Sequence, residues 1–580
     1  MKNKATSFER SQIEKIKQSI AEAINKIVKK DIVKATNLIY PPNQNFGDLS
    51  LPCFELAKEF KKTSVEMAEF LTSKIKLDNI ILTTKVIGPY LNFILDKSKL
   101  ATIIIEEILS AEQSYGLNNL GNKEKVMIEY SNANTHKEYH VGHLRNICYG
   151  DAVAKILLAN GYKVSSVSYI NDFGIHVAKT IWAYQSFYEK EKEPINKGYF
   201  LGKVYVRACE ELEKNKEDKS AVGLIMKNIE SRQGIDYQLW KETRQWSIDG
   251  FDKIYQKLKI KFDQIFYESE YIDNGLDMVV KLYQKFFLIK SEGAVIADLE
   301  KFNLGVLLFL RSDGTALYPV ADLPLAIEKF KKYKINKSIY VVDARQSLYF
   351  KQLFKVLELL GFKQEMKHLS YEFVKLPEGM MSSRTGNVIT FDDLYLQALE
   401  KALLEIKKRH QDWNDEKIKL VAKKIVIGVL KFEMIKVSAD KVITFDIEQA
   451  LRFDGFTSTY LQYTVARINS IMSKSKVESL KSKKSEVVLD NLKDIKEHFL
   501  IIKLAKYPEI IKIAGENYDP SEIAKYLFEL AQEFNDYYHS VQILKTEEEI
   551  MQARLALIMA VKQVVMNGLE LLGIEVVEEM

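Results

Sequence analysis

The order of strand, loop, helix and strand within residues 125–169 constrains the fold of this chain more than any other feature. Residues 125–130 form a short apolar run, a loop follows, and His140-Val141-Gly142-His143 opens a stretch of helical period that reaches Leu158. A second short apolar run spans residues 163–169. Two short buried strands that are joined by a helix are typical of a parallel pair, because a helix supplies the crossover connection that parallel neighbours need. The segment therefore predicts the start of a parallel α/β sheet.

The rest of the chain extends this reading in both directions. Sheet features resume at residues 307–310 and 338–342 and end near 388–390, whereas residues from about 183 to 260 are charged and helical, which predicts an insertion. Beyond Asp392 nearly everything has helical period. Residues 1–110 read as a small α+β domain, and the Asn- and Gly-rich residues 116–122 as a linker. A chain of 580 residues has room for about four domains.

Composition excludes several classes of protein. The three cysteines, Cys53, Cys148 and Cys209, lie far apart, so neither a disulfide framework nor a cysteine zinc site is expected, and the compartment is predicted to be the reducing cytosol. The sequence contains no run of about 18 apolar residues, so no membrane span is predicted. With 84 basic and 79 acidic residues the net charge is only +5, so a nucleic-acid partner would need a local basic face.

Arginine is scarce in this chain. Only 12 of the 84 basic residues are arginine, against 72 lysines, which fits an AT-rich genome. An arginine that persists in such a chain is expected at a position that needs its planar fork of donors. Six of the 12 fall within or beside the segments described below: Arg145, Arg311, Arg345, Arg384, Arg452 and Arg467.

His140 and His143 lie three apart at the predicted start of a helix, where free N–H groups and the helix dipole favour an anion such as phosphate. Gly142 leaves room for a base or ribose close to the backbone. On its own the pattern is weak evidence, because a pair of hydrogen-bonded structural histidines would look the same. A zinc pair is disfavoured, since no third ligand stands at a suitable spacing.

The surrounding residues strengthen the case. Residues 128–146 resemble the HIGH motif of class I aminoacyl-tRNA synthetases, in the extended form of the arginyl-tRNA synthetases. Further segments resemble the same family in order along nearly the whole chain: 46–48, 88–93, 169–174, 312–322, 340–346, 381–387, 453–455, 459–467, 526–531 and 568–574. A colinear set of this length would be hard to assemble by chance.

The resemblance implies an ATP site. His140 and His143 would hold the triphosphate, with Asn134, Gly142 and the KMSKS-like residues Met381, Ser382 and Ser383 around the nucleotide. Met380 and Ser383 occupy both lysine positions of that loop, which puts its cationic role in doubt. Lys137, just before the HIGH motif, and Arg384 are the two candidates to replace the missing charge.

The resemblance also implies an arginine pocket. A guanidinium is recognised best by carboxylates that accept paired N–H bonds. Asp322 and Tyr318 would face it, Glu129, Asn132 and Asn134 would shape the pocket, and Gln346 would lie near the α-amino group. Tyr318 and Asp322 are four apart, so a helix would place them side by side. Otherwise Tyr318 would pack in a core and Asp322 would cap a helix.

For tRNA, the resemblance implies that the C-terminal helices read anticodon bases, which aromatic and amide side chains can stack on and bind. The candidates there are Tyr460, Gln462, Tyr463, Arg467, Asn535, Tyr537 and Tyr538, and Asn92 and Phe93 are weaker candidates for the tRNA elbow. Tyrosine is common here, with 30 in all, so each alone could belong to a core.

Together these features predict a multidomain α/β protein with a Rossmann-type parallel-sheet catalytic domain, a small α+β N-terminal domain and an all-α C-terminal domain. The expected parts are 1–110 (tRNA-binding), 120–395 (catalytic), 396–450 (helical, stem-contacting) and 451–580 (anticodon-binding). The expected protein is a cytoplasmic, monomeric arginine–tRNA ligase with ATP as substrate, Mg²⁺ accompanying ATP, and no zinc or membrane. Two rivals stay open: another class I synthetase or nucleotidylyltransferase, and a non-catalytic RNA-binding paralogue.

Overall fold

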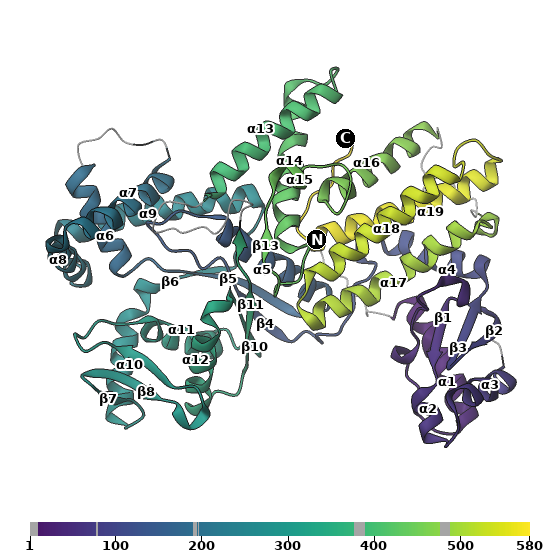
Figure 1. Cartoon of the computed structure of the whole chain (residues 1–580), viewed down its shortest axis with the longest axis horizontal. Coiled ribbons are helices and arrows are strands. Elements are labelled where there is room, and N and C mark those ends of the chain that lie inside the picture. The colour runs from purple at the N-terminus through teal and green to yellow at the C-terminus, as the bar shows by residue number, and fades with distance from the viewer. Residues whose placement is uncertain (1–9, 77–78, 189–193, 195, 376–388, 476–487) are drawn as a thin grey trace.

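A computed structural model describes residues 10–76, 79–188, 194, 196–375, 389–475 and 488–580 (Figure 1). Buried apolar side chains form three clusters. The largest spans the N-terminal part, one side of the central sheet and the C-terminal helices. In Figure 1 the N-terminal part lies at the lower right, the inserted helices at the upper left, a second lobe at the lower left, and the C-terminal helices along the top and right.

Five parallel strands form the central sheet, in the order β11, β10, β4, β5, β6. These strands are β4 (Lys125–Glu129), β5 (Lys163–Ile170), β6 (Gln264–Tyr267), β10 (Lys337–Asp343) and β11 (Glu365–Tyr371). Ile128 pairs with Ile339 on one side and with Ser166 on the other. The predicted parallel sheet is confirmed, together with its strands near residues 125, 163 and 338.

One strand was assigned to the wrong sheet. The apolar run at 307–310 belongs to β9 (Val306–Leu310), which pairs antiparallel with β8 (Ala294–Asp298) in a separate sheet with β7 (Ile289–Ser291). A short apolar run does not reveal the direction of its partner. The predicted end of the sheet near 388–390 is also wrong for the residues that the structure describes there. Thr390 forms only an isolated antiparallel bridge with His140 and belongs to no strand of the sheet.

Helix α5 (Val141–Ala159) makes the crossover from β4 to β5. It packs against β5 and β10 on one side and against α14 (Asp415–Ile435) and α17 (Ile495–Asn517) on the other, so nearly all of it is buried. Gly150 permits this close packing, since a Cβ there would lie 2.3 Å from Cγ of Tyr130. The first turn of α5 thus reaches the carboxyl edge of the sheet, where ligands of open α/β sheets bind.

Two groups of elements interrupt the sheet. The inserted helices between β5 and β6 are α6 (Ile175–Phe187), α7 (Lys197–Lys214), α8 (Lys219–Glu230) and α9 (Gly234–Leu258), and α6 to α9 share a small core of their own. The second lobe contains β7 to β9, α10 (Ile272–Gln284), α11 (Tyr318–Lys332) and α12 (Ser347–Leu359). The described residues of the charged stretch from 183 to 260 lie mostly in these helices, as the sequence predicts.

The N-terminal part is a small α+β unit. Its strands β1 (Leu49–Pro52), β2 (Ile81–Ile87) and β3 (Tyr90–Leu95) form an antiparallel sheet with β3 in the centre. Its helices are α1 (Gln12–Val28), α2 (Phe54–Glu59), α3 (Ser64–Lys74) and α4 (Lys97–Ala111). The unit docks on α17, where Asp48 Oδ1 lies 2.6 Å from His498 Nε2 and Tyr40 donates to Glu509 at 3.1 Å.

The C-terminal part is almost entirely helical. Besides α14 and α17, it contains α13 (Phe391–Arg409), α15 (Ile447–Ala450), α16 (Ser458–Lys474), α18 (Pro520–Ser540) and α19 (Glu548–Leu571), and its short strand β13 (Ile443–Thr444) pairs with β12 (Val374–Lys375). Over the described part of the chain, no helix combines the length and the apolar character needed to cross a bilayer.

Candidate active site

His140 and His143 form a compact pair at the start of α5. His140 is the N-cap, and its Nδ1 accepts a hydrogen bond from the Gly142 N–H at 3.1 Å. The His140 N–H in turn donates to Nδ1 of His143 at 3.2 Å, and the two ring centroids lie 4.0 Å apart. Because both Nδ1 atoms accept, each neutral ring carries its proton on Nε2 and can donate it to a ligand. A Cβ at Gly142 would lie 2.9 Å from the His140 ring, so glycine fits this turn.

The protonation state of this pair follows from its surroundings. Burial, then the charges of Lys137 and Arg345, lower the pKa of His140 to about 4. Burial, His140 and Lys137 together hold the pKa of His143 well below its usual value. Both rings are therefore neutral at pH 7 and act as polar N–H donors instead of cations.

The loop that carries Asn134 and Lys137 is anchored to the inserted helices. His136 is fully buried with φ of 61°, and its ring bonds to Thr135 Oγ1 at 2.9 Å and to Thr243 Oγ1 of α9 at 2.8 Å. Its N–H donates to Ser247 Oγ at 3.0 Å. This anchor, which the sequence analysis missed, holds the loop beside the histidine pair.

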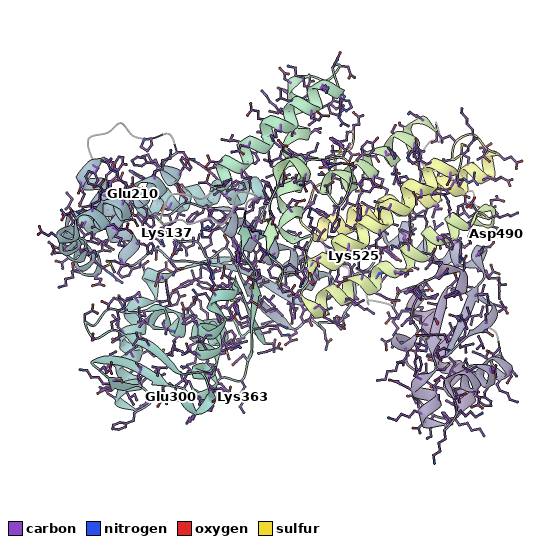
Figure 2. The ribbon with its side chains drawn as sticks, in the orientation of Figure 1. Lys137, Glu210, Glu300, Lys363, Asp490 and Lys525 are labelled. Atoms are coloured by element: carbon purple, nitrogen blue, oxygen red, sulfur yellow. The ribbon has the colours of Figure 1, made fainter. Side chains whose placement is uncertain are left out.

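Lys137 belongs to this loop and lies beside the inserted helices (Figure 2). Its ammonium is 5.1 Å from the centroid of the Tyr205 ring in α7, and its charge contributes to the lowered pKa of both His140 and His143. The structure therefore places this cation within electrostatic reach of the histidine pair.

All six residues predicted to bind arginine line one cavity of about 190 Å³. Glu129 ends β4, Asn132 and Asn134 follow it, Tyr318 and Asp322 lie on the first turns of α11, and Gln346 precedes α12. Leu317 is the N-cap of α11 and Tyr318 is 57% exposed. Asp322 is therefore not a cap and Tyr318 is not a core residue, so the two structural alternatives for this pair are excluded.

A buried ion pair forms part of the cavity lining. The Lys329 ammonium contacts Glu129 Oε2, and Asn132 Nδ2 donates to Glu129 Oε1 at 2.9 Å. Burial alone would lower the pKa of Lys329, but Glu129 and Tyr340 outweigh it and the pKa is raised. Lys329 is fully buried and stays charged, and it neutralises Glu129.

Asp322 lines the cavity and Glu268 lies behind its lining residue Asn171, and neither carboxyl group forms an ion pair with a described cation. Asp322 accepts a hydrogen bond from Tyr349, and burial raises its pKa to about 7. Glu268 accepts from Asn171 Nδ2 at 3.0 Å, and burial raises its pKa to about 8. Such a pair is suited to a ligand that brings one positive charge with several N–H donors. Glu268, Lys329, Tyr349 and Asn171 were missed from the sequence.

A second cavity, of about 680 Å³, lies in the C-terminal helices and is lined by Tyr463, Arg467 and Tyr538. Arg467 donates to Tyr463 Oη at 2.9 Å and contacts Asn535 Oδ1. Its guanidinium carbon lies 4.6 Å from the Tyr463 ring centroid and 5.1 Å from that of Tyr538. Tyr460 lies one turn before Tyr463 on α16, and its side chain hydrogen-bonds to Asn535. Five of the predicted tRNA-binding residues thus come together.

Four other predicted tRNA contacts are corrected by the structure. Gln462 is fully buried on the opposite face of α16 and donates to the Glu575 carbonyl at 2.7 Å. Tyr537 is fully buried and donates to Glu497 Oε1 at 3.2 Å. Asn92 and Phe93, on the central strand β3, are 1% and 0% exposed. These side chains are packed inside the protein and are not available to a nucleic acid.

The KMSKS-like residues Met381, Ser382, Ser383 and Arg384 lie outside the described residues. The chain re-enters the described part beside the histidine pair, where Val141 N–H donates to the Ile389 carbonyl at 3.3 Å and Phe391 N–H to the Tyr139 carbonyl at 2.8 Å. Within the described ranges no group of three or more His, Cys, Asp or Glu side chains could hold a metal ion.

Sequence profiles of three families match the chain in succession. The profile of the arginyl-tRNA synthetase N-terminal domain matches residues 14–95, that of the class I (R) tRNA synthetase catalytic domain matches residues 104–446, and that of the DALR anticodon-binding domain matches residues 461–580. The catalytic profile alone covers more than half of the chain.

Known proteins are similar over almost the same length. The chain is 37% identical to the arginine–tRNA ligase of Bdellovibrio bacteriovorus over 95% of each sequence, and 36% identical to that of Clostridium botulinum over 97% of this chain and 100% of the relative. The structure of Thermus thermophilus arginyl-tRNA synthetase superposes with a TM-score of 0.82 at 25% identity, covering 97% of this chain and 100% of that one. The chain therefore belongs to the arginyl-tRNA synthetase family of class I aminoacyl-tRNA synthetases.

Proposed function

We propose that the chain is an arginine–tRNA ligase, which uses ATP to activate L-arginine and transfers it to the 3′ end of the arginine tRNA. The observation that carries the proposal is the small cavity lined by Asp322, with Glu268 bonded to its lining residue Asn171, where neither carboxyl group forms an ion pair among the described residues. A carboxylate pair in such a site favours a guanidinium, which brings one charge and several donors in a plane.

Activation joins the arginine carboxylate to the α-phosphate of ATP. A carboxylate oxygen forms the new bond to phosphorus while the bond to the bridging oxygen breaks and pyrophosphate leaves. The reaction needs alignment and charge stabilisation and no covalent bond to the protein. We assign the Nε2–H groups of His140 and His143 to the triphosphate, with Asn134 and Gly142 beside the nucleotide and Lys137 as the nearby cation. Met381, Ser382, Ser383 and Arg384 are assigned to the nucleotide from their place in the sequence.

In the transfer step, a hydroxyl at the 3′ end of the tRNA attacks the carbonyl of arginyl-adenylate and AMP leaves. We assign Asp322 and Tyr318 to the guanidinium, Glu268 to a supporting charge behind Asn171, and Gln346 to the α-amino group. Glu129, Asn132 and Asn134 shape the wall between them. Unpaired carboxyl groups left behind by a shorter or singly donating side chain would disfavour lysine.

The remaining assignments concern the partners and the parts of the chain. We assign residues 1–110 and 451–580 to tRNA binding, residues 396–450 to contact with the tRNA stem, and Tyr460, Tyr463, Arg467, Asn535 and Tyr538 to the anticodon. Mg²⁺ would accompany ATP through its phosphates, and no zinc is needed by this chemistry. We propose a cytoplasmic monomer.

The test is ATP–pyrophosphate exchange by the purified chain with arginine, with and without the matching tRNA. The family resemblance predicts strong exchange only when tRNA is present, and arginine should exceed every other amino acid. Robust exchange with arginine alone would contradict the tRNA requirement. Exchange driven by a different amino acid would favour another class I synthetase, and tRNA binding without any exchange would favour a non-catalytic paralogue.

A further inference from the structure

Arg145 is a fully buried arginine whose guanidinium forms no ion pair with a carboxylate among the described residues and bonds to backbone carbonyls instead. It lies on α5, two residues after His143, and is 1% exposed. Its Nη1 donates to the carbonyls of Glu372 at 2.6 Å and Phe373 at 3.3 Å, and its Nη2 donates to those of Ser438 at 3.4 Å and Ala439 at 3.1 Å. Burial lowers the pKa of Arg145 to about 10, so the group is still a cation at neutral pH.

The four carbonyls belong to two segments that are distant in sequence. Glu372 and Phe373 connect β11 to β12, and Ser438 and Ala439 follow α14 and lead to β13. The two segments also bond to each other, because the Glu372 N–H donates to the Ala439 carbonyl at 2.9 Å. Arg145 therefore joins the start of α5 to the junction between the catalytic sheet and the C-terminal helices.

Asn146, the next residue, attaches the same turn of α5 to the central sheet. Asn146 Nδ2 donates to the Val341 carbonyl of β10 at 2.7 Å and to Tyr371 Oη of β11 at 3.1 Å, while its Oδ1 accepts from the Ser131 N–H at 2.5 Å. Arg145 and Asn146 together fix the first turns of α5 in three directions. The orientation of the histidine pair depends on this turn, since His140 and His143 belong to it.

Only arginine can make these contacts. A guanidinium presents five donors in a rigid plane, whereas an ammonium is a point charge that cannot reach four carbonyls on two segments. Lysine outnumbers arginine 72 to 12 in this chain, so an arginine at this position is not explained by abundance. A buried cation without a counter-ion is also costly unless its donors are satisfied.

We propose that Arg145 is a positioning residue for amino-acid activation: its guanidinium fixes the turn that carries His140 and His143 against the junction of the catalytic sheet and the C-terminal helices. It does not touch the substrates itself. This inference rests on the proposed ligase function. Misplacement of catalytic groups by about 1 Å can cost on the order of 100-fold in rate, so loss of the fork should reduce turnover.

The test compares R145K with the wild-type chain and with N160A in tRNA-dependent ATP–pyrophosphate exchange, with rates normalised to the number of active sites by titration. Asn160 ends the same helix, is fully buried, and donates to the Ile511 carbonyl at 3.0 Å. It therefore controls for general loss of stability. For R145K we expect kcat per active site to fall about 10- to 100-fold, the KM for ATP to rise, and the KM for arginine to change by less than about twofold. N160A should lower the Tm without this fall.

The inference is overturned if R145K keeps wild-type kcat and KM per active site and only its Tm or active fraction falls, because that result describes a structural role alone. R145Q, which keeps a planar amide, replaces R145K if the latter does not fold. Failure of both variants to fold would assign Arg145 to folding and overturn the inference too. Absence of arginine-dependent exchange in the wild-type chain would instead contradict the proposed function.

Discussion

Asp322 occupies an unusual position for a carboxyl group. It lines the arginine cavity, hydrogen-bonds to Tyr349, and is not paired with a cation among the described residues, because Lys329 is taken up by Glu129. Its pKa is raised to about 7 mainly by burial. The free protein thus holds a partly protonated acid that a guanidinium would convert to a paired carboxylate.

Replacing Asp322 by asparagine should raise the KM for arginine by on the order of 100-fold or more, since loss of one partner from a buried ion pair costs about 3–5 kcal/mol. The side chain keeps its size, so the cavity should keep its shape. The measurement is the arginine KM in tRNA-dependent exchange. E328Q is the control, because Glu328 lies on the same helix and pairs with Lys332. A D322N enzyme with wild-type arginine KM would remove Asp322 from the arginine site.

The pH dependence of arginine binding should follow the same groups. Asp322 and Glu268 have pKa values of about 7 and about 8 in the free protein, and a bound guanidinium lowers both because it favours the charged forms. Binding therefore releases protons, so affinity rises with pH. Between pH 6 and 8.5 the arginine KM should fall, by up to about tenfold per pH unit for each proton released. A KM that stays constant over this range in the wild-type enzyme would contradict the linkage, and D322N should show a weaker slope.

A substitution of Lys137 tests its proposed role beside the ATP phosphates. K137A should lower the activation kcat by about 100-fold, because it removes a cation near the developing phosphoryl charge, while arginine KM stays within about threefold. K363A is a matched control, since Lys363 lies at the far tip of the second lobe (Figure 2). Unchanged turnover in K137A would leave the missing charge of the KMSKS-like loop to another residue, with Arg384 the remaining candidate.

The sequence predicted the six cavity residues because each stands within a short segment that resembles the family. Glu268, Tyr349 and Lys329 were not predicted, since each comes from a separate place in the chain and meets Asp322 or Glu129 only after folding. Lys329 left a weak signal: it stands seven residues after Asp322, so a helix places both on one face. His136 left none, because its partners Thr243 and Ser247 are more than 100 residues away.

At the scale of elements, helix α16 places residues assigned to tRNA on one face and core residues on the opposite face. Tyr460, Tyr463 and Arg467 follow one face, spaced by three and four residues, and reach the C-terminal cavity or Asn535. Gln462 points into the core from the other face. The sequence named all four, because composition alone does not distinguish a buried amide from a base-reading one.

This separation predicts opposite phenotypes for two variants of one helix. R467A should weaken tRNA binding, with a loss of about 1–3 kcal/mol of the kind seen for stacking and cation–π contacts, and leave the arginine KM unchanged. Q462A should lower the Tm and leave the tRNA Kd near wild type, because it removes a buried hydrogen bond. Filter binding and thermal unfolding measure both. Equal losses of tRNA affinity in the two variants would contradict the assignment of faces.

The strands illustrate a similar limit. The runs near residues 125, 163 and 338 were correctly placed in one parallel sheet, because the helices between them force crossovers. The run at 307–310 was apolar and short in the same way, yet β9 pairs antiparallel with β8 in a separate sheet. Sequence period identifies a strand, whereas the choice of partner depends on neighbours that only the fold provides.

At the scale of the whole molecule, polar contacts tie the N-terminal unit to the C-terminal helices. Asp48 meets His498 of α17, and Lys17 meets Glu509. Asp48 also accepts from the Leu95 N–H at 2.7 Å, so the Phe46-Gly47-Asp48 segment that resembles the family serves domain docking here. With Asn92 and Phe93 buried, any tRNA contact of this unit must use other side chains.

Aminoacylation of the arginine tRNA by the purified chain tests the central claim most directly. With ATP and Mg²⁺ present, we expect arginine to be esterified to the tRNA 3′ end, and lysine to be charged about 10⁴-fold less efficiently, as in sites built around polar recognition of the correct side chain. Charging of another amino acid in preference to arginine, or no charging with any amino acid, would contradict the account.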